Sequence, residues 1–393
     1  MRKPVLLIIG LLCVYACGKT IEQNKDTSDS DNLLKAKIDE LGERYLNLGR
    51  FSGVILLSEN GQITYKDSFG YSEDSLQIGF TDNTAFKVGE LGQLFQLAVL
   101  KYLLDTEVIS NEDSLNASIS TEKGDLRLNA LFSEEKIHMI LSDDSLLLEN
   151  QLVKLLEKNS GRTYHELFNE VSKELALENS YYEGKDKSLA QGYLYSIEVG
   201  KGVVLTRSPS QSFENDLYSR GLKTTVTDML KIVNYLGQDI DFNGFLAEDG
   251  FSYSVFNDQK EQTTIIILSN RRQPITGEIS RSVHAIAKAE SYQLPLAREM
   301  VEMEAEKLDE FIGEYQINEQ MQFKVARNAD SLFAYFGPNK LWLLPQSDNQ
   351  FYLEISDAAM RFERDSLGQV YQVRLLNGFM DSDEVAKKIG VKR

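Results

Sequence analysis

The feature that most constrains this sequence is the segment from Phe86 to Asp105, which reads FKVGELGQLFQLAVLKYLLD. Its apolar residues recur at helical spacing on two adjoining faces, so the segment predicts a helix that is apolar nearly all round. A helix of this kind is stable only when other elements cover it on every side. The chain must therefore build a domain around this helix.

Two elements are predicted immediately before this helix. Residues 33–48 carry apolar side chains at helical spacing on one face and predict an amphipathic helix. Residues 51–72 read FSGVILLSENGQITYKDSFGYS, two apolar runs joined by Asn60-Gly61, a dipeptide that tolerates the positive φ angles of a tight hairpin turn. The order is therefore helix, hairpin, buried helix.

This order, together with the phrase TAFKVGELGQLF, resembles the N-terminal part of the serine β-lactamase-related family, which includes class C β-lactamases, DD-peptidases and related esterases. The family has a Ser and a Lys three residues apart at the start of the central helix. Carried onto this chain, the position of the serine nucleophile is Glu90 and the position of the lysine is Gln93. Both catalytic groups are replaced.

The replacement removes the chemistry of the pair. Residues three apart share a helix face, so a Lys there can take the hydroxyl proton of the Ser. Gln93 cannot titrate, and the charge of Glu90 would repel the carboxylates that β-lactams and D-alanyl peptides carry. A carboxylate in the first turn of a helix is favoured by the helix dipole by about 0.3–1 kcal/mol. We therefore predict a structural role for Glu90.

The other two catalytic motifs of the family also fail at the positions where the resemblance places them. The hydroxyl-x-Asn motif corresponds to Leu141-Ser142-Asp143, in which Ser142 and Asp143 are able to bind a ligand but are more typical of helix N-caps. The Lys-Thr-Gly or His-x-Gly motif corresponds to Asn243-Gly244-Phe245. We predict no catalytic residue and a degenerate pocket whose candidates are Glu90, Gln93, Ser142, Asp143, Asn243 and Gly244.

The resemblance implies an α/β domain over residues 33–292, in which strands from both ends of the segment form an antiparallel sheet flanked by helices. From Glu306 the pattern changes to short segments with period-two alternation separated by turn residues. This pattern predicts a small all-β antiparallel domain, a sandwich or a barrel, over residues 306–378. Residues 293–305 are the expected linker and residues 379–393 the expected loose tail.

The beginning of the chain resembles a bacterial lipoprotein signal peptide over residues 1–16. Val14-Tyr15-Ala16-Cys17 resembles a lipobox, which implies that Cys17 is the lipidated first residue of the mature protein. The polar, acidic residues 17–32 are then expected to form a disordered tether. An uncleaved membrane anchor is the alternative, and both interpretations predict a location in the cell envelope, outside the cytoplasm.

Composition narrows the expected partners. The formal net charge is −18 and no basic cluster occurs, which argues against nucleic acid and against electrostatic docking to anionic lipid. Cys13 and Cys17 are the only cysteines, and the three histidines are scattered in the sequence, so no metal and no cofactor is predicted. The expected partners are the membrane, through the N-terminal lipid, and a protein, a peptide or a peptidoglycan-like ligand.

Three functional hypotheses follow. The first is a lipid-anchored, catalytically inactive relative of the serine hydrolases that acts in binding or scaffolding. The second is an active hydrolase that uses Ser120, Ser133 or Ser142 with an unrecognised partner group. The third is that the C-terminal β domain is the ligand- or protein-binding module and that the α/β domain displays it.

Overall fold

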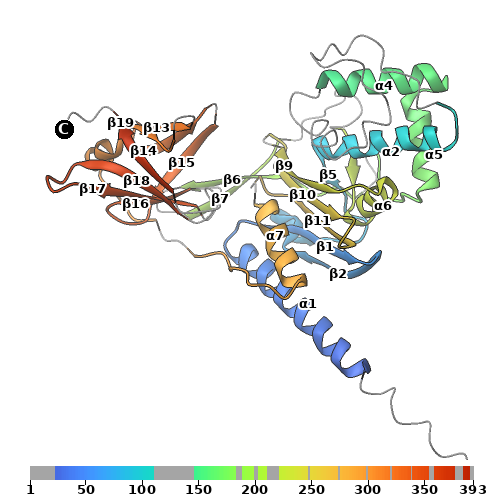
Figure 1. Cartoon of the computed structure of the whole chain (residues 1–393), viewed down its shortest axis with the longest axis horizontal. Helices are drawn as coiled ribbons and strands as arrows, with labels where there is room; N and C mark the ends of the chain where they lie inside the picture. Colours follow the sequence, from blue (N-terminus) through green and yellow to red (C-terminus); the bar gives the residue numbers. More distant parts are fainter. Residues whose placement is uncertain are drawn as a thin grey trace, which may run out of the picture.

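The computed structural model of the chain describes residues 23–109, 146–182, 188–198, 202–209, 221–246, 248–272, 275–297, 300–318, 321–337, 339–353, 358–376 and 384–389. Two domains are present, an α/β domain and a C-terminal barrel (Figure 1). The elements of the first domain are α1 Gln23–Asn47, β1 Gly53–Glu59, β2 Gln62–Phe69, β3 Tyr71–Glu73, β4 Ile78–Gly79, β5 Phe86–Lys87, α2 Gly92–Asp105, α4 Leu146–Ser160, α5 Tyr164–Glu174, β6 Tyr193–Glu198, β7 Gly202–Arg207, β8 Lys223–Thr224, α6 Val226–Leu236, β9 Ile240–Leu246, β10 Phe251–Asp258, β11 Thr263–Ser269 and α7 Thr276–Ala287.

The centre of the first domain is an antiparallel sheet in which the described strands follow the order β2-β1-β11-β10-β9. The predicted hairpin is confirmed, since Asn60 and Gly61 make the turn between β1 and β2 with φ angles of 51° and 76°. β1 pairs with β11 from Gly53 opposite Ser269 to Glu59 opposite Thr263. Strands from the two ends of the segment therefore meet in one sheet, as the sequence predicts.

Helices cover both faces of this sheet. On one face α1 and α7 pack against side chains such as Ile55 and Ile267. On the other face α2 and α6 pack against Leu56 and Ile266, with α4 and α5 outside α2 (Figure 1). Because successive residues of a strand point to opposite faces, the continuous apolar runs of β1 and β11 supply both cores.

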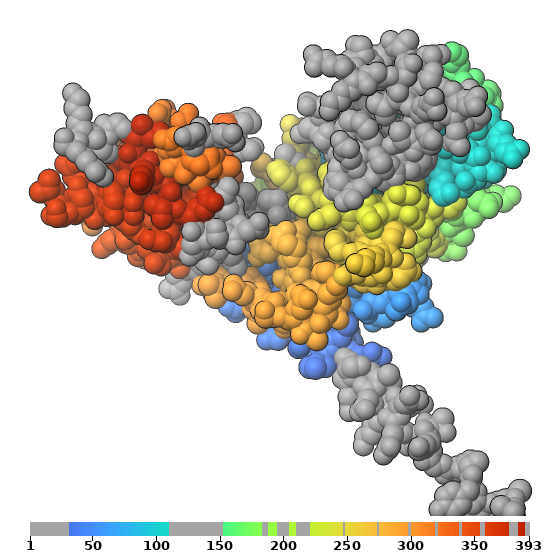
Figure 2. All heavy atoms as spheres, in the orientation of Figure 1, coloured from blue at the N-terminus to red at the C-terminus, as the bar shows by residue number. Residues whose placement is uncertain are grey.

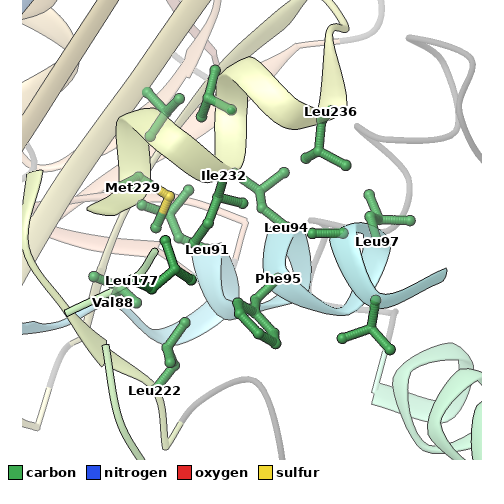
Figure 3. Close-up of a cluster of buried hydrophobic side chains, with 14 of the residues drawn as sticks. Val88, Leu91, Leu94, Phe95, Leu97, Leu177, Leu222, Met229, Ile232 and Leu236 are labelled. Atoms are coloured by element: carbon green, nitrogen blue, oxygen red, sulfur yellow. The ribbon is translucent and has the colours of Figure 1, made fainter. Parts of the chain in front are cut away.

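The predicted central helix is α2, and it is buried on nearly every side. Seven of its apolar side chains from Leu94 to Leu103 are buried. Figure 3 shows Leu94 and Leu97 of α2 beside Ile232 and Leu236 of α6, while Phe95 points away from α6. Phe95 instead meets Phe168 of α5, with ring centroids 4.6 Å apart.

The second domain is a closed eight-stranded antiparallel barrel, so the alternative of a sandwich does not apply. Its elements are α8 Ala305–Leu308, a 3-10 turn Asp309–Phe311, β12 Gly313–Gln316, β13 Gln322–Asn328, β14 Ser331–Phe336, β15 Asn339–Pro345, β16 Gln350–Leu353, β17 Ala359–Arg364, β18 Val370–Leu376 and β19 Glu384–Ile389. The fully buried ring of Phe311 lies 4.8 Å, centroid to centroid, from both Phe351 and Phe362. Side chains thus form a packed core inside the barrel.

The last strand corrects the expected loose tail. β19 lies within residues 379–393 and pairs with both β12 and β18, which closes the barrel. Its sequence, EVAKKI, buries only Ala386 and half-buries most of the rest. A strand with so few apolar residues gives a weak sequence pattern. Its backbone nevertheless forms hydrogen bonds with the edges of both neighbouring strands.

The first helix also differs from the expectation. The sequence predicts order from near Leu33, whereas α1 begins at Gln23, so residues 23–32 of the expected tether are helical. The lack of apolar side chains in residues 23–32 predicts that they do not pack in a core, but it does not prevent local helix formation. Figure 1 shows this part of α1 projecting away from the domain.

The two domains contact each other through the β6–β7 hairpin and the linker. The hairpin extends from the sheet of the first domain to the barrel (Figure 1), where Leu205 packs on the outer face formed by Leu344, Tyr352 and Ala359. Met300 of the linker joins the same cluster. In Figure 2 the barrel, orange to red, forms the left-hand mass of the molecule. None of the described helices is both long and apolar enough to span a membrane.

Candidate functional site

The position that the resemblance assigns to the nucleophile lies in a 3-10 turn, Gly89–Leu91, that leads directly into α2. Gly89 has a φ of 48°, and a Cβ at this residue would lie 2.5 Å from Cδ2 of Leu246. Only glycine fits both the backbone conformation and the close approach of β9. The turn therefore places Glu90 between the start of α2 and the edge strand β9.

The Glu90 carboxylate accepts a hydrogen bond from the hydroxyl of Tyr253, a residue of β10. Tyr253 is 1% exposed, and Glu90 is half-buried. A hydrogen bond to an ionised acceptor is stronger than one between neutral groups. This contact fixes the carboxylate against the sheet.

Gly244 is the residue that makes room for Tyr253. The two residues pair directly across β9 and β10, and a Cβ at position 244 would lie 2.9 Å from both Cε2 and Oη of Tyr253. On the same face of β9, Phe242 stacks on Tyr253 with ring centroids 6.1 Å apart. We use the term Glu90 site for Glu90, Gln93, Phe242, Gly244 and Tyr253.

Gln93, at the position of the family's lysine, lies in the first turn of α2 and is 2% exposed. Its amide is neutral at every pH and cannot accept a proton from a nucleophile. The nearest ammonium along the chain is that of Lys87, whose Nζ lies 2.5 Å from Oδ1 of the buried Asp249. The positive charge of Lys87 is therefore paired with Asp249, whereas a lysine must be uncharged to accept a proton.

Asn243 does not join the Glu90 site. Successive residues of a strand point to opposite faces, so Asn243 and Gly244 diverge. The Asn243 side chain lies against Gly277 at the start of α7, since a Cβ at Gly277 would lie 2.9 Å from Cγ of Asn243. The structure thus brings Glu90 and Gly244 together at Tyr253, places Gln93 in the first turn of α2 three residues after Glu90, and separates Asn243 from them.

The remaining sequence-predicted residues lie outside the described part of the chain. These are Ser142 and Asp143 of the second motif, the alternative nucleophiles Ser120 and Ser133, and the lipidation residue Cys17. Within the described ranges no three His, Cys, Asp or Glu side chains come together in a way that would hold a metal ion.

A second polar cluster lies where the β6–β7 hairpin leaves the sheet. Tyr193 donates a hydrogen bond of 2.5 Å to Glu73, and Arg207 lies 3.2 Å from the same carboxylate. Burial alone would raise the pKa of Glu73, but the hydrogen bonds from Ser75 and Tyr193 and the charge of Arg207 together lower it. Glu73 is therefore held in its charged form.

Arg271 completes this cluster from the end of β11. Its guanidinium donates a hydrogen bond of 3.0 Å to Asp74 and lies 5.1 Å from the ring centre of Tyr193. Burial lowers the pKa of Arg271, and the carboxylate of Asp74 opposes this effect. These contacts fasten the base of the hairpin to the sheet, which favours a structural role for the cluster.

Tyr253 is the residue of the site that the sequence does not reveal. Its strand reads FSYSVFND, a pattern that predicts burial but not a polar partner. A large side chain opposite a glycine is a recognisable cross-strand pair once the register is known. The sequence alone does not define the register between β9 and β10, so Gly244 was identified without the residue that it accommodates.

Similarity to known proteins is structural. No protein-family model matches the sequence, and no curated protein sequence matches it either. The octameric penicillin-binding protein homologue from Pyrococcus abyssi aligns over 90% of this chain and 99% of its own, with a TM-score of 0.50 and 15% identity. FmtA from Staphylococcus aureus aligns over 65% of this chain and 87% of its own, with a TM-score of 0.49 and 18% identity. A class C β-lactamase aligns over 70% of this chain and 99% of its own, with a TM-score of 0.49 and 15% identity.

The first of these likenesses shows the fold, and at 15% identity it shows nothing more. The chain therefore has a penicillin-binding-protein-like fold.

Proposed function

We propose that this chain is a catalytically inactive relative of the serine β-lactamase-related proteins and that it acts in binding or scaffolding at the cell envelope. The observation that carries the proposal is the hydrogen bond from Tyr253 to Glu90 at the nucleophile position. A carboxylate held by a buried phenol is part of the packing of the sheet. It lacks both the hydroxyl and the base of a serine hydrolase.

The position of the base supports the same conclusion. In a serine hydrolase the nucleophile and its base act as a unit, and loss of either one removes most of the rate. Here the neutral amide of Gln93 replaces the base, and the nearby Lys87 is paired with Asp249. Two replacements at neighbouring positions are coherent with a site that no longer performs acyl transfer.

A binding role fits the charge at the site. The Glu90 carboxylate disfavours ligands that carry a carboxylate at this point, as β-lactams and D-alanyl peptides do. It favours groups that donate hydrogen bonds, such as ammonium, guanidinium or amide groups of a protein or peptide. We therefore place a protein or peptide ligand ahead of a peptidoglycan-like ligand.

The barrel is less suited to hold a ligand within its walls. Its core contains the buried aromatic rings of Phe311, Phe351 and Phe362. Part of its outer face is covered by Leu205 of the hairpin. A partner of the β domain would therefore bind to the remaining outer surface.

Attachment to the membrane is the second part of the proposal. It rests on the resemblance of residues 14–17 to a lipobox and predicts a lipid on Cys17. Metabolic labelling with an alkyne-bearing palmitate analogue would test it in cells that produce the full chain. We expect label on the wild type and none on a Cys17→Ser variant, and equal labelling of the two would contradict the proposal.

Mass spectrometry tests the lack of covalent serine chemistry. The soluble form that starts at Gly18 is incubated with a reactive fluorophosphonate and, separately, with a penicillin, and its intact mass is measured. We expect no adduct with either reagent. A stoichiometric adduct on one serine, with Ser120, Ser133 and Ser142 as the candidates, would establish an active hydrolase instead.

A further inference from the structure

A cavity of about 260 Å³ lies at the β2 edge of the sheet, between β1, the segment from Phe80 to Phe86 and the start of α6. We use the term Thr84 cavity for this space. β2 and β9 are the two opposite edges of the sheet (Figure 1). The Thr84 cavity is therefore separate from the Glu90 site, and its ligand preference does not depend on the state of Glu90.

One wall of the Thr84 cavity is aromatic. Phe80 and Phe86 stack with ring centroids 5.5 Å apart and an interplanar angle of 16°. Phe86 is 1% exposed and fixes the stack in the core, whereas Phe80 is half-buried. A rigid aromatic wall of this kind packs well against a flat ring that presents C–H groups.

Another part of the lining carries hydroxyl groups. Thr84 is 3% exposed, and its Oγ1 accepts the N–H of Thr81 at 2.9 Å and lies 3.1 Å from the Thr81 hydroxyl. Thr225, also 3% exposed, accepts the N–H of Asp228 through its Oγ1. These side chains are held in place by the backbone and line a space rather than fill it.

An ion pair lies in the same lining. Lys66 Nζ lies 2.5 Å from Oδ1 of Asp82, and the side chains are 30% and 82% exposed, respectively. An exposed pair of this kind is weak, so each member can exchange part of its contact for a ligand group. The Lys66 ammonium is a strong hydrogen-bond donor and the Asp82 carboxylate is a strong acceptor, and the net charge of the pair is close to zero.

These features select a ligand class. A purely apolar ligand would gain nothing from the polar groups of Lys66 and Asp82, and an anion would have to compete with Asp82 for Lys66. A neutral ring with several hydroxyl groups satisfies both walls, because its C–H face meets Phe80 and its hydroxyls meet the polar side. An engineered cavity of about 150 Å³ holds benzene, so about 260 Å³ accommodates a substituted six-membered ring.

We propose that the Thr84 cavity binds a neutral polyhydroxylated six-membered ring, either a free monosaccharide or the end residue of a glycan.

Titration of the soluble chain, followed by saturation-transfer NMR, tests this proposal. The probes are glucose and N-acetylglucosamine as free sugars, their β-1,4-linked disaccharides as end residues, and benzoate as an anion of similar size. We expect saturable binding of at least one sugar below about 10 mM. Stronger binding of a disaccharide than of its monosaccharide would identify a glycan end, and the reverse would identify a free sugar. Absence of sugar binding up to about 10 mM, or benzoate binding as tightly as any sugar, would overturn the proposal.

Two variants locate the binding. Asp82→Asn removes the charge of a side chain that is 82% exposed and should weaken sugar binding about tenfold without affecting folding. Phe80→Ala removes the aromatic wall and should weaken binding to a similar extent. The matched control is Asp330→Asn, an exposed aspartate of the barrel, which should leave binding unchanged. Sugar binding that neither Asp82→Asn nor Phe80→Ala alters would place the ligand elsewhere and refute the proposal.

Discussion

Replacement of Tyr253 by Phe tests the contact that defines the Glu90 site. The variant removes only the hydroxyl that donates to Glu90 and keeps the ring that stacks on Phe242. A hydrogen bond to a charged acceptor contributes about 1.5–3 kcal/mol. Because Glu90 is half-buried, it can recover part of this through water in the variant. We therefore expect a loss of about 1–2 kcal/mol in the free energy of unfolding of the α/β domain.

The assay must separate the two domains, because a chain of this kind need not unfold in one step. The sequence has a single tryptophan, Trp342, which lies in β15 of the barrel. Trp342 packs on the same outer-face cluster as Leu205 of the hairpin, so its fluorescence reports on the barrel and on its contact with the hairpin, whereas far-UV circular dichroism reports on both domains. With an m-value of about 2 kcal/mol/M, the variant should lower the urea midpoint of the α/β transition by about 0.5–1 M.

A matched control and a double-mutant cycle make this test decisive. Tyr335→Phe removes a half-buried hydroxyl from β14 of the barrel and should leave the α/β transition unchanged. Combination of Tyr253→Phe with Glu90→Gln should cost less than the sum of the two single variants, by about 1 kcal/mol. A loss below about 0.5 kcal/mol, or additive effects, would refute the account of the Glu90 site.

Three further predictions concern Gly244 of the Glu90 site and two other parts of the fold. Gly244→Ala places a methyl group 2.9 Å from Tyr253 and should destabilise the α/β domain by about 1–3 kcal/mol, whereas Gly79→Ala, with no atom within 4 Å of the new Cβ, should be nearly neutral in the same urea titration. The pKa of Glu73 is lowered in the folded state from its ordinary value of 4.5, so the stability it confers is present above that pH and is lost as the pH falls through the folded-state pKa. In the Glu73→Gln variant the free energy of unfolding should therefore fall less steeply as the pH drops below about 4.5. An unchanged slope in this pH range would contradict the prediction. Deletion of residues 384–393 removes β19 and should abolish the cooperative unfolding transition of the barrel in tryptophan fluorescence. An unchanged transition would instead support the interpretation of this segment as a loose tail.

The elements with strong hydrophobic patterns were predictable from the sequence. The central helix, the first hairpin strand β1 and the late strand β11 carry long apolar runs because they are buried on two sides, and Asn60-Gly61 marks the hairpin turn. The sequence pattern does not predict β19, because pairing with β12 and β18, rather than burial of its own side chains, stabilises this strand. The hydrophobic pattern does not predict the early start of α1, because helix formation there does not depend on burial.

The candidate site was predictable only in part, for a geometric reason. Motif positions along the chain identify Glu90, Gln93 and Gly244, because each follows or precedes a recognisable element. The face of a strand on which a residue lies depends on register, and a shift of one residue reverses it. The motif position therefore predicts Asn243 and Gly244 together, although the structure places them on opposite faces of β9. For the same reason the partner of Glu90 on β10 was not foreseen.

The most direct test of the central claim is turnover by the soluble chain. Purified protein is compared with its Glu90→Ala variant on a p-nitrophenyl ester, a chromogenic cephalosporin and a D-alanyl-D-alanine peptide. This assay also detects chemistry that uses the carboxylate itself, to which serine-directed reagents are blind. We predict no hydrolysis above the uncatalysed rate for either protein. Hydrolysis by the wild type that is lost in Glu90→Ala would show that Glu90 is catalytic and would contradict the account.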